Sequence, residues 1–157
     1  MKILLLSDSH GNRKGMMTAV EKYGGNADII VHCGDATRGE AEDLVDYNPD
    51  KTVICVRGNC DWGSTLKDVE YLEAGSKRIM ITHGHFFGVK YGFDTLAEKA
   101  AEENCDIAFF GHTHNPTDVT EGGVRMINPG SCGMYKPCCA VVEIDDKGNV
   151  LVNHLQI

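Results

Sequence analysis

Short groups of carboxylate, amide and imidazole side chains follow five separate apolar runs of this 157-residue chain. Side chains of these types bind metal ions, and their mixture of oxygen and nitrogen atoms suits Mn, Fe, Co, Ni or Zn. A cysteine-rich set would instead favour zinc or an iron–sulfur cluster. In chain order the groups are Asp8-Ser9-His10, His32-Cys33-Gly34-Asp35, Gly58-Asn59-Cys60-Asp61, Thr82-His83-Gly84-His85 and Gly111-His112-Thr113-His114.

Each group alone also has an ordinary structural explanation, as a capping carboxylate, a solvated histidine or a turn. The run from Gly111 to His114 is the most specific, because two imidazoles two residues apart have little packing purpose. The ordinary explanations would have to hold independently after five strands. The sequence therefore favours one common metal site.

The apolar runs before these groups are the elements that must position them. Short apolar runs alternate with amphipathic stretches, which is the pattern of an α/β fold. In such sheets ligands bind at the carboxyl ends of the strands, so the five loops can converge on one place. The neighbouring glycines Gly34, Gly58, Gly84 and Gly111 permit the tight turns and close backbone approach that convergence requires.

The remaining pattern indicates two sheets. The predicted strands cover residues 2–6, 29–32, 52–56, 69–72, 78–82, 107–110, 117–120, 124–127, 140–144 and 150–152, and the predicted helices cover 13–23, 39–46 and 95–103. The first half has β-α-β order and the second half consists mainly of hairpins. We expect two packed sheets with helices outside, in a single domain that spans residues 1–157.

The composition excludes several other classes of protein. A net charge of −8 argues against a protein that wraps nucleic acid, since phosphate neutralisation needs clustered Lys and Arg. The apolar run after Lys2 is too short for a signal peptide, and no segment approaches the length of a membrane helix. We expect a cytoplasmic protein without membrane contact or strong nucleic-acid binding. A phosphate-bearing substrate would then need metal ions to receive its charge.

The seven cysteines do not form a recognisable motif. No Cys-x-x-Cys pair occurs, which argues against a zinc ribbon or a thioredoxin-type site, and an odd number argues against a disulfide framework. Cys33, Cys55 and Cys105 lie in or beside apolar runs and are interpreted as small buried residues. Cys138 and Cys139 are either a redox pair or alternating residues of a late strand, and the second interpretation is preferred.

In this order the five groups resemble the pattern of the calcineurin-like metallophosphoesterase superfamily, which is Asp-x-His, Gly-Asp, Gly-Asn-His-Asp/Glu, a lone His and Gly-His-x-His. The resemblance covers nearly the whole chain. Gly58-Asn59-Cys60-Asp61, Thr82-His83-Gly84-His85 and Asn128-Pro129-Gly130-Ser131 are most similar to its small prokaryotic phosphodiesterase branch. The retromer's small metallophosphoesterase-like subunit is related to this branch. The resemblance implies a four-layer α/β/β/α sandwich of two mixed sheets.

The resemblance also implies two divalent metal ions, with Mn²⁺ expected and Fe, Ni, Co or Zn as alternatives. A first ion would be bound by Asp8, His10 and His114 and a second by Asn59, His83 and His112, with Asp35 bridging both. A hydroxide that bridges the ions would attack the phosphoester. The implied catalytic residues are Asn59, Cys60, His83 and His85, and the implied substrate is a small-molecule phosphodiester.

Cys60 departs from the superfamily pattern, in which a histidine contacts the phosphate and assists the leaving group. A thiol with an ordinary pKa near 8.5 is a poor substitute for an imidazolium donor, although the small branch often has this cysteine. We therefore expect a preference for diesters with good leaving groups. His85 either takes over part of the donor role or is hydrogen-bonded to the backbone.

Four aromatic residues, Trp62, Phe86, Phe87 and Tyr91, closely follow the predicted site groups. They either line a pocket for a base or aryl group, or pack in the core or in a contact between subunits. The second interpretation is preferred for at least two of them. Relatives of this kind often form dimers or tetramers, and the resemblance leaves a homo-oligomer open.

Three rival functions compete with a small-molecule phosphodiesterase. The main alternative is a metal-binding scaffold of the same fold with little or no catalysis, as in the retromer subunit, but all seven ligand positions are intact. A nuclease is disfavoured by the net charge of −8. A nucleotide-binding α/β protein lacks its fingerprint, because His10-Gly11-Asn12-Arg13 is neither a P-loop nor Gly-x-Gly-x-x-Gly.

Overall fold

The apolar runs and amphipathic stretches form ten strands and three α-helices in the computed structural model, which describes residues 1–157. The strands are β1 Lys2–Leu6, β2 Ile29–His32, β3 Thr52–Cys55, β4 Val69–Ala74, β5 Lys77–Thr82, β6 Ile107–Phe109, β7 Thr117–Glu121, β8 Val124–Asn128, β9 Cys138–Ile144 and β10 Val150–Gln156. The helices are α1 Arg13–Tyr23, α2 Glu40–Asp46 and α3 Asp94–Glu102, with a short 3₁₀ helix at His85–Phe87. Every predicted element is present, and the largest difference is that β10 runs on to Gln156.

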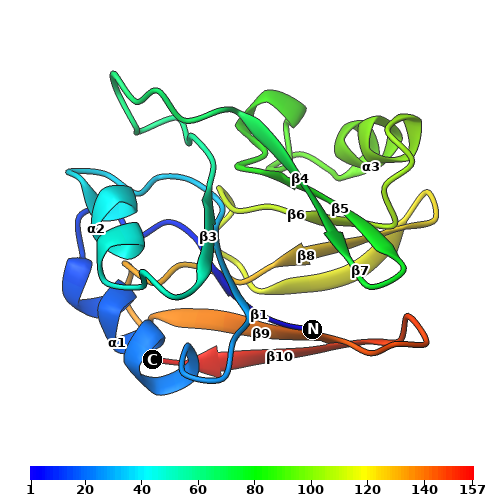
Figure 1. Ribbon diagram of the computed structural model, residues 1–157. Coiled ribbons are helices and arrows are strands. Elements are labelled where there is room, and N and C mark those ends of the chain that lie inside the picture. The colour runs from blue at the N-terminus through cyan, green and yellow to red at the C-terminus, as the bar shows by residue number, and fades with distance from the viewer.

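Two five-stranded sheets lie face to face, with the helices on their outer sides (Figure 1). The first sheet has the order β10-β9-β1-β2-β3 and the second the order β4-β5-β6-β8-β7. Both sheets mix parallel and antiparallel pairs. The predicted α/β/β/α sandwich of two mixed sheets is therefore confirmed.

Strand β1 is buried on both faces because it lies in the middle of the first sheet. Successive side chains of a strand point to opposite faces. Ile3 and Leu5 accordingly pack between the sheets with Ile79 of β5, whereas Leu4 and Leu6 pack toward α1. A third apolar cluster lies between α3 and the outer face of the second sheet. The three clusters separate the four layers.

The parallel strands decide where the polar groups meet. β1, β2 and β3 run parallel in the first sheet, and β5, β6 and β8 run parallel in the second. Backbone hydrogen bonds hold these loops together, from Cys132 N to Ser7 O at 3.0 Å between the two sheets and from Gly111 N to His83 O at 3.2 Å within the second sheet. The carboxyl ends of both sheets therefore lead to one place.

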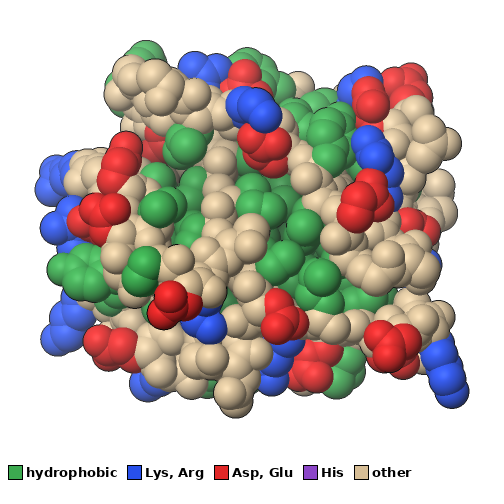
Figure 2. Space-filling model, in the orientation of Figure 1, with side chains coloured by type: hydrophobic (Ala, Val, Ile, Leu, Met, Phe, Trp, Pro, Cys, Tyr) green, Lys and Arg blue, Asp and Glu red, His purple; other side chains and the backbone are tan.

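Hydrophobic side chains gather in the middle of the face that contains the edge strands β3 and β4 (Figure 2). There Val53, Ile54, Leu66 and Tyr71 line an apolar groove of about 400 Å³. The two strands belong to different sheets and do not pair with each other. The sandwich is therefore open along these edges, away from the polar loops.

The cysteines follow the preferred interpretation. All seven are free, and Cys138 and Cys139 lie next to each other in β9. Cys33 and Cys105 are buried, and Cys55 is partly buried beside the apolar cluster under α1. None of the helices has the length and apolar character that a membrane-spanning segment requires.

Candidate metal centre

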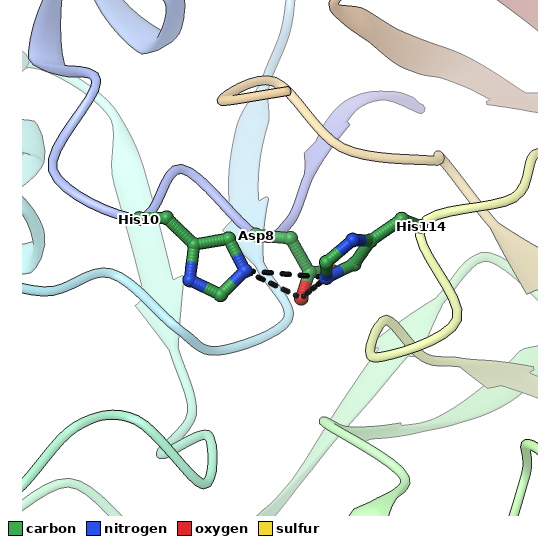
Figure 3. A group of neighbouring side chains, drawn as sticks. All are labelled: Asp8, His10 and His114. Atoms are coloured by element: carbon green, nitrogen blue, oxygen red, sulfur yellow. Dashed lines mark hydrogen bonds and ion pairs between the residues drawn. The ribbon is translucent and has the colours of Figure 1, made fainter. Parts of the chain in front are cut away.

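The loops after the parallel strands bring all seven predicted ligands together in two groups. The first group contains Asp8, His10 and His114, which point toward one another from the loops after β1 and β6 (Figure 3). Asp8 Oδ1 lies 3.1 Å from His114 Nε2 and 3.7 Å from His10 Nε2. The two imidazole Nε2 atoms are 3.2 Å apart. Three possible ligand atoms therefore face a common centre.

The second group contains Asn59, His83 and His112. His83 Nε2 lies 3.1 Å from Asn59 Oδ1 and 3.2 Å from His112 Nδ1. Its ring is fully buried, whereas Asn59 is exposed. The second group is thus anchored in the protein and open at its outer side.

Asp35 lies between the two groups. Its Oδ2 atom is 3.8 Å from His10 Nε2 and 3.4 Å from His83 Nε2, so one oxygen faces a member of each group. Its Oδ1 atom accepts a hydrogen bond from Cys60 N at 2.7 Å, which fixes the orientation of the carboxylate. This is the arrangement that a bridging ligand requires.

The separations within the groups suit bound metal ions. At metal–ligand distances of about 2.0–2.2 Å, neighbouring ligand atoms of one ion lie about 3.0–3.5 Å apart. The closest separations in the two groups, 3.1 and 3.2 Å, fall in this range, and the longer ones at 3.7 and 3.8 Å involve His10, which is partly exposed. The donors are carboxylate oxygens, an amide oxygen and imidazole nitrogens, a mixture that suits transition metals.

Two atoms in the centre lack the partners that a metal ion would supply. His83 Nδ1 donates to Cys33 O at 2.7 Å, so the lone pair of a neutral ring lies on Nε2 and faces the acceptor oxygens of Asn59 and Asp35. Asp8 Oδ1 is buried and receives no hydrogen bond. A buried acceptor without a donor is costly, and a cation beside it removes that cost. The residues present therefore fit divalent metal ions.

The electrostatics of the centre favour positive charge. Burial lowers the pKa of His83, but its hydrogen bond to Asp35 and the charges of Asp8 and Asp35 outweigh burial and raise it. Burial raises the pKa of Asp8, yet His114 and His83 hold it below its ordinary value. Burial and the charge of His83 lower the pKa of His112 to about 4, which keeps its ring neutral and able to bind a metal at neutral pH.

The backbone at the ligands is unusual. Asp8, His10, Asp35, His112 and His114 have φ values of 56°, 49°, 56°, 66° and 60°, in the left-handed region that non-glycine residues rarely adopt. Such conformations cluster at functional sites because the surrounding structure must enforce them. The loops therefore fold in a way that directs side chains inward at an energetic cost.

Polar groups around the centre hold the ligands in place. Asp8 Oδ2 accepts hydrogen bonds from Ser7 Oγ at 2.6 Å and from His112 N at 3.0 Å. Asp61, nearly fully buried, accepts from Asp35 N at 2.9 Å and from Gly58 N at 2.8 Å. Each carboxylate thereby ties two loops together, and the Ser7 hydroxyl supports a ligand rather than acting as a nucleophile.

Two supporting segments lie outside the five predicted groups. Ser131 Oγ donates to Asp8 O at 2.7 Å, and Asn128 Nδ2 donates to Gly111 O at 2.8 Å. Glu40, buried at the start of α2, accepts from Ser9 Oγ at 2.7 Å and Gly11 N at 2.9 Å. The run Asn128-Pro129-Gly130-Ser131 follows a strand as the other groups do, so position was a usable signal for it. Nothing local marks Glu40.

Cys60 and His85 lie beside the centre. Cys60 Sγ and ligand atoms of His10 and Asp35 lie within 4.8 Å of one another. Burial and the Asp35 carboxylate raise the pKa of the Cys60 thiol to about 11, so the thiol is neutral. The His85 ring centroid is 5.4 Å from that of His83, and His85 Nδ1 is buried without a hydrogen bond. The backbone hydrogen bond considered for His85 is not formed through this nitrogen.

The other candidates divide between core and surface. His32 is fully buried with both ring nitrogens unpartnered, and burial lowers its pKa to about 4. Phe87 packs against the apolar cluster under α3. Trp62, Phe86 and Tyr91 are 92%, 64% and 98% exposed. Among the four aromatics, only Phe87 therefore contributes to the core.

Comparison with known proteins decides the family. A family model described as a calcineurin-like phosphoesterase superfamily domain matches residues 1–147. The chain belongs to this superfamily. The probable metallophosphoesterase YsnB of Bacillus subtilis is 37% identical over 134 residues, which cover 83% of this chain and 75% of YsnB. The phosphodiesterase MJ0936 of Methanocaldococcus jannaschii is 28% identical over 170 residues, which cover 94% and 95% of the two chains.

Solved structures of the superfamily fold agree with the sandwich. A predicted phosphoesterase of Streptococcus pneumoniae matches with a TM-score of 0.78 at 28% identity, covering 99% of this chain and 97% of that chain. Vps29 of Entamoeba histolytica, solved in complex with Zn²⁺, matches with a TM-score of 0.75 at 23% identity over 99% of both chains. At that identity the likeness to Vps29 concerns the fold alone. The metallophosphoesterase family to which the chain belongs uses divalent metal ions.

Proposed function

We propose that this protein is a dinuclear-metal-dependent phosphodiesterase. The observation that carries the proposal is the pair of three-residue groups that share one oxygen, Asp35 Oδ2, at 3.8 Å from His10 and 3.4 Å from His83. Relatives named phosphodiesterases, MJ0936 and YfcE, are each 28% identical over most of this chain.

The reaction would combine the ions with positioned side chains. Two divalent ions neutralise phosphate charge and lower the pKa of bound water, so that hydroxide is available near neutral pH. Asp35 would keep the two groups at a fixed separation, because the hydrogen bond from Cys60 N to Oδ1 fixes the orientation of its carboxylate. His83 is oriented by its hydrogen bond to Cys33 O. Asn59, at the exposed rim, lies where a substrate oxygen arrives.

The leaving group receives less assistance than in enzymes with a histidine at position 60. A thiol whose pKa is raised to about 11 is neutral but a weak acid, so it transfers a proton to a departing alkoxide poorly. His85 lies close enough to His83 to share this role, with ring centroids 5.4 Å apart. We therefore propose a preference for diesters with good leaving groups.

The proposed cofactor and substrate follow from charge and donor type. Mixed oxygen and nitrogen donors suit first-row transition metals, and Mn²⁺ is proposed first on the resemblance to the superfamily, with Fe, Ni, Co or Zn as alternatives. The net charge of −8 disfavours long polyanions, so a small-molecule diester is proposed as substrate.

Turnover of bis(p-nitrophenyl) phosphate with added Mn²⁺ tests the proposal. We expect hydrolysis by the wild type, its loss on chelation with EDTA, and a reduction of at least about 100-fold in Asn59→Ala and His83→Ala. Asn153→Ala is the matched control for Asn59→Ala, because this asparagine is exposed on β10 outside the site loops. The rate should fall because each of these substitutions removes a ligand and leaves only one ion correctly bound.

The scaffold alternative makes the opposite prediction. If no turnover occurs with Mn²⁺, Fe²⁺, Ni²⁺, Co²⁺ or Zn²⁺, while metal still binds and stabilises the fold, the protein is a metal-binding interaction module. Equal residual rates in wild type and in both ligand variants would also contradict the enzyme proposal.

A further inference from the structure

A polar pocket of about 360 Å³ opens directly beside the metal centre. It lies between the loop 36–39 and the loop 60–64, and Cys60 forms one of its walls. Cys60 Sγ also lies within 4.8 Å of ligand atoms of His10 and Asp35. Cys60 therefore lies between the pocket and the metal centre, and the volume of the pocket lies at the lower end of the range for small-molecule sites.

Arg38 is the one cationic residue that lines this pocket, which the acidic residues Glu42 and Asp61 also line. Four of the five arginines pair with a carboxylate: Arg13 with Asp43, Arg57 with Asp68, Arg78 with Glu73 and Arg125 with Asp118. Arg38 forms no ion pair and its guanidinium donates no hydrogen bond. In a chain of net charge −8, an unpaired guanidinium in a pocket is available for an anion.

The Arg38 side chain lies beside the loop that carries His10. A Cβ atom on Gly11 would lie 3.4 Å from Arg38 Cδ and 3.7 Å from its Nε, so the side chain passes over the residue that follows His10. The backbone at Arg38 has a φ of 60°, in the left-handed region. The loop thus adopts a costly conformation that places the Arg38 side chain beside Gly11, the neighbour of the predicted ligand His10.

Trp62 supplies an aromatic surface on the other side of the pocket. It lines the pocket and is 92% exposed. Its loop is held by hydrogen bonds from Trp62 N to Cys60 O at 3.0 Å and from Ser64 N to Asp61 O at 3.2 Å. An exposed indole on a tied loop offers a face for stacking a planar ring.

We propose that this pocket is a nucleotide subsite, in which a nucleobase stacks on Trp62 and a second phosphate of the nucleotide pairs with Arg38. The ester phosphate of the same nucleotide then lies at the metal centre, which Cys60 joins to the pocket. This inference rests on the proposed function and names its substrate class. The substrate is a phosphodiester of a nucleotide that carries a second phosphate.

Fluorescence of the protein tests binding directly, because Trp62 is its single tryptophan. We expect thymidine 5′-monophosphate and thymidine 3′,5′-bisphosphate to quench the metal-loaded protein saturably, while methyl phosphate does not. The bisphosphate should bind about tenfold more tightly, since a guanidinium–phosphate pair is a strong charge-assisted contact. Arg38→Ala should abolish this tenfold difference. Lys147→Ala, which removes an exposed charge elsewhere, should keep it.

Kinetics give a second readout that does not depend on fluorescence. The ratio of kcat/KM for thymidine 5′-(p-nitrophenyl phosphate) to that for methyl p-nitrophenyl phosphate should fall about tenfold in Trp62→Ala, because a stacked base is lost. The matched control is Tyr47→Ala, which removes a 68% exposed aromatic ring outside the pocket.

The possible results separate the two proposals. Turnover of methyl p-nitrophenyl phosphate without saturable quenching, or with the same substrate ratio in Trp62→Ala, overturns the subsite and leaves the phosphodiesterase intact. Saturable quenching without turnover of either ester overturns the phosphodiesterase and supports the nucleotide site. A bisphosphate advantage that survives in Arg38→Ala contradicts the role given to Arg38.

Discussion

Five predicted metal ligands project from backbone that L-amino acids adopt at a cost. The φ values of Asp8, His10, Asp35, His112 and His114 lie between 49° and 66°. Each such residue costs about 1–2 kcal/mol relative to an ordinary conformation. No single contact offsets this sum, so the strain is distributed over the loops and supported by the hydrogen bonds around Asp8 and Asp35. The conformations of these ligand residues are therefore stabilised by hydrogen bonds from neighbouring residues.

This strain predicts that glycine at position 10 gives a more stable protein than alanine, the reverse of the usual order. In the metal-free protein, His10→Gly should be more stable than His10→Ala by about 1 kcal/mol, because glycine adopts a φ near 49° without strain. Urea unfolding in EDTA measures the difference. At His154, in strand β10, the order should reverse, since glycine weakens a strand. The same order at both positions would show that the His10 conformation is not strained.

Position 60 predicts a change in substrate preference. Cys60→His should raise kcat/KM for phenyl phosphate, a monoester with a poorer leaving group, relative to bis(p-nitrophenyl) phosphate by about tenfold or more, because an imidazolium donates a proton to the leaving group more effectively than a neutral thiol. Steady-state kinetics on the two substrates give the ratio. Cys60→Ser, which keeps the size and lacks a donor of suitable pKa, serves as control. An unchanged ratio in Cys60→His would remove position 60 as a determinant of substrate choice.

At the scale of the element, the centre depends on how closely two loops of the first sheet approach. A Cβ atom on Gly58 would overlap the carboxylate and backbone nitrogen of Asp35. Gly58 therefore allows the loop after β3 to lie against the loop after β2, and Asp61 bonds both loops together through their backbone N–H groups. The bridging position of Asp35 is set by this contact between loops.

Gly58→Ala should accordingly disrupt the centre without touching a ligand. We expect a loss of at least about tenfold in diester turnover and a loss of stability of about 1–3 kcal/mol, as for overpacking of a close-packed site. Turnover assays and urea unfolding provide the two values. Gly25→Ala is the matched control, because its Cβ would meet nothing within 4 Å. Wild-type turnover in Gly58→Ala would mean that the loops need not approach so closely.

The sequence predicted the elements and the site loops well because both depend on local signals. Apolar runs of strand length and polar groups at their ends mark β1, β2, β3, β5 and β6 directly. The pairing of β9 with β1 had no such signal, since the two strands are far apart in the chain and their antiparallel register forms only in the folded state. The distribution of hairpins between the two sheets was unpredictable for the same reason.

The site residues that the sequence did not predict are those far along the chain from the ligands they support. Ser131 and Asn128 follow β8 and were noted as a motif, but their hydrogen bonds to Asp8 O and Gly111 O required the pairing of β8 with β6. Arg38 lies in a loop and Glu40 begins helix α2. Both residue types are ordinary for a solvated surface. Only the fold shows that one is buried beneath the centre and the other lines its pocket.

At the scale of the whole molecule, the chain carries a net charge of −8 and buries Asp8 and Asp35 at its centre. Buried carboxylates are stable only when paired or bound to metal. The pKa values of both are held below their ordinary values by histidines, so the metal-free protein keeps these groups ionised at neutral pH. Cations in the centre should therefore stabilise the entire fold.

Saturating Mn²⁺ should raise the melting temperature measurably. At a concentration of 100 times Kd, one bound ion adds about 2.7 kcal/mol, and for a chain of this length each kcal/mol shifts Tm by about 2–4 °C. Thermal unfolding with Mn²⁺ and with EDTA measures the shift. Asp35→Asn should lose most of it, because the shared ligand becomes neutral. An identical Tm with and without metal would argue against ions bound to the native state.

The number of ions bound per chain tests the dinuclear centre most directly. Mn²⁺ binding followed by electron paramagnetic resonance, with free ion quantified at each addition, gives this number without reference to catalysis. We predict two Mn²⁺ per wild-type chain, one in His10→Ala, which removes a ligand of the first group, and one in His83→Ala, which removes a ligand of the second. A wild-type chain that binds one ion or none at saturation would contradict the two-metal site.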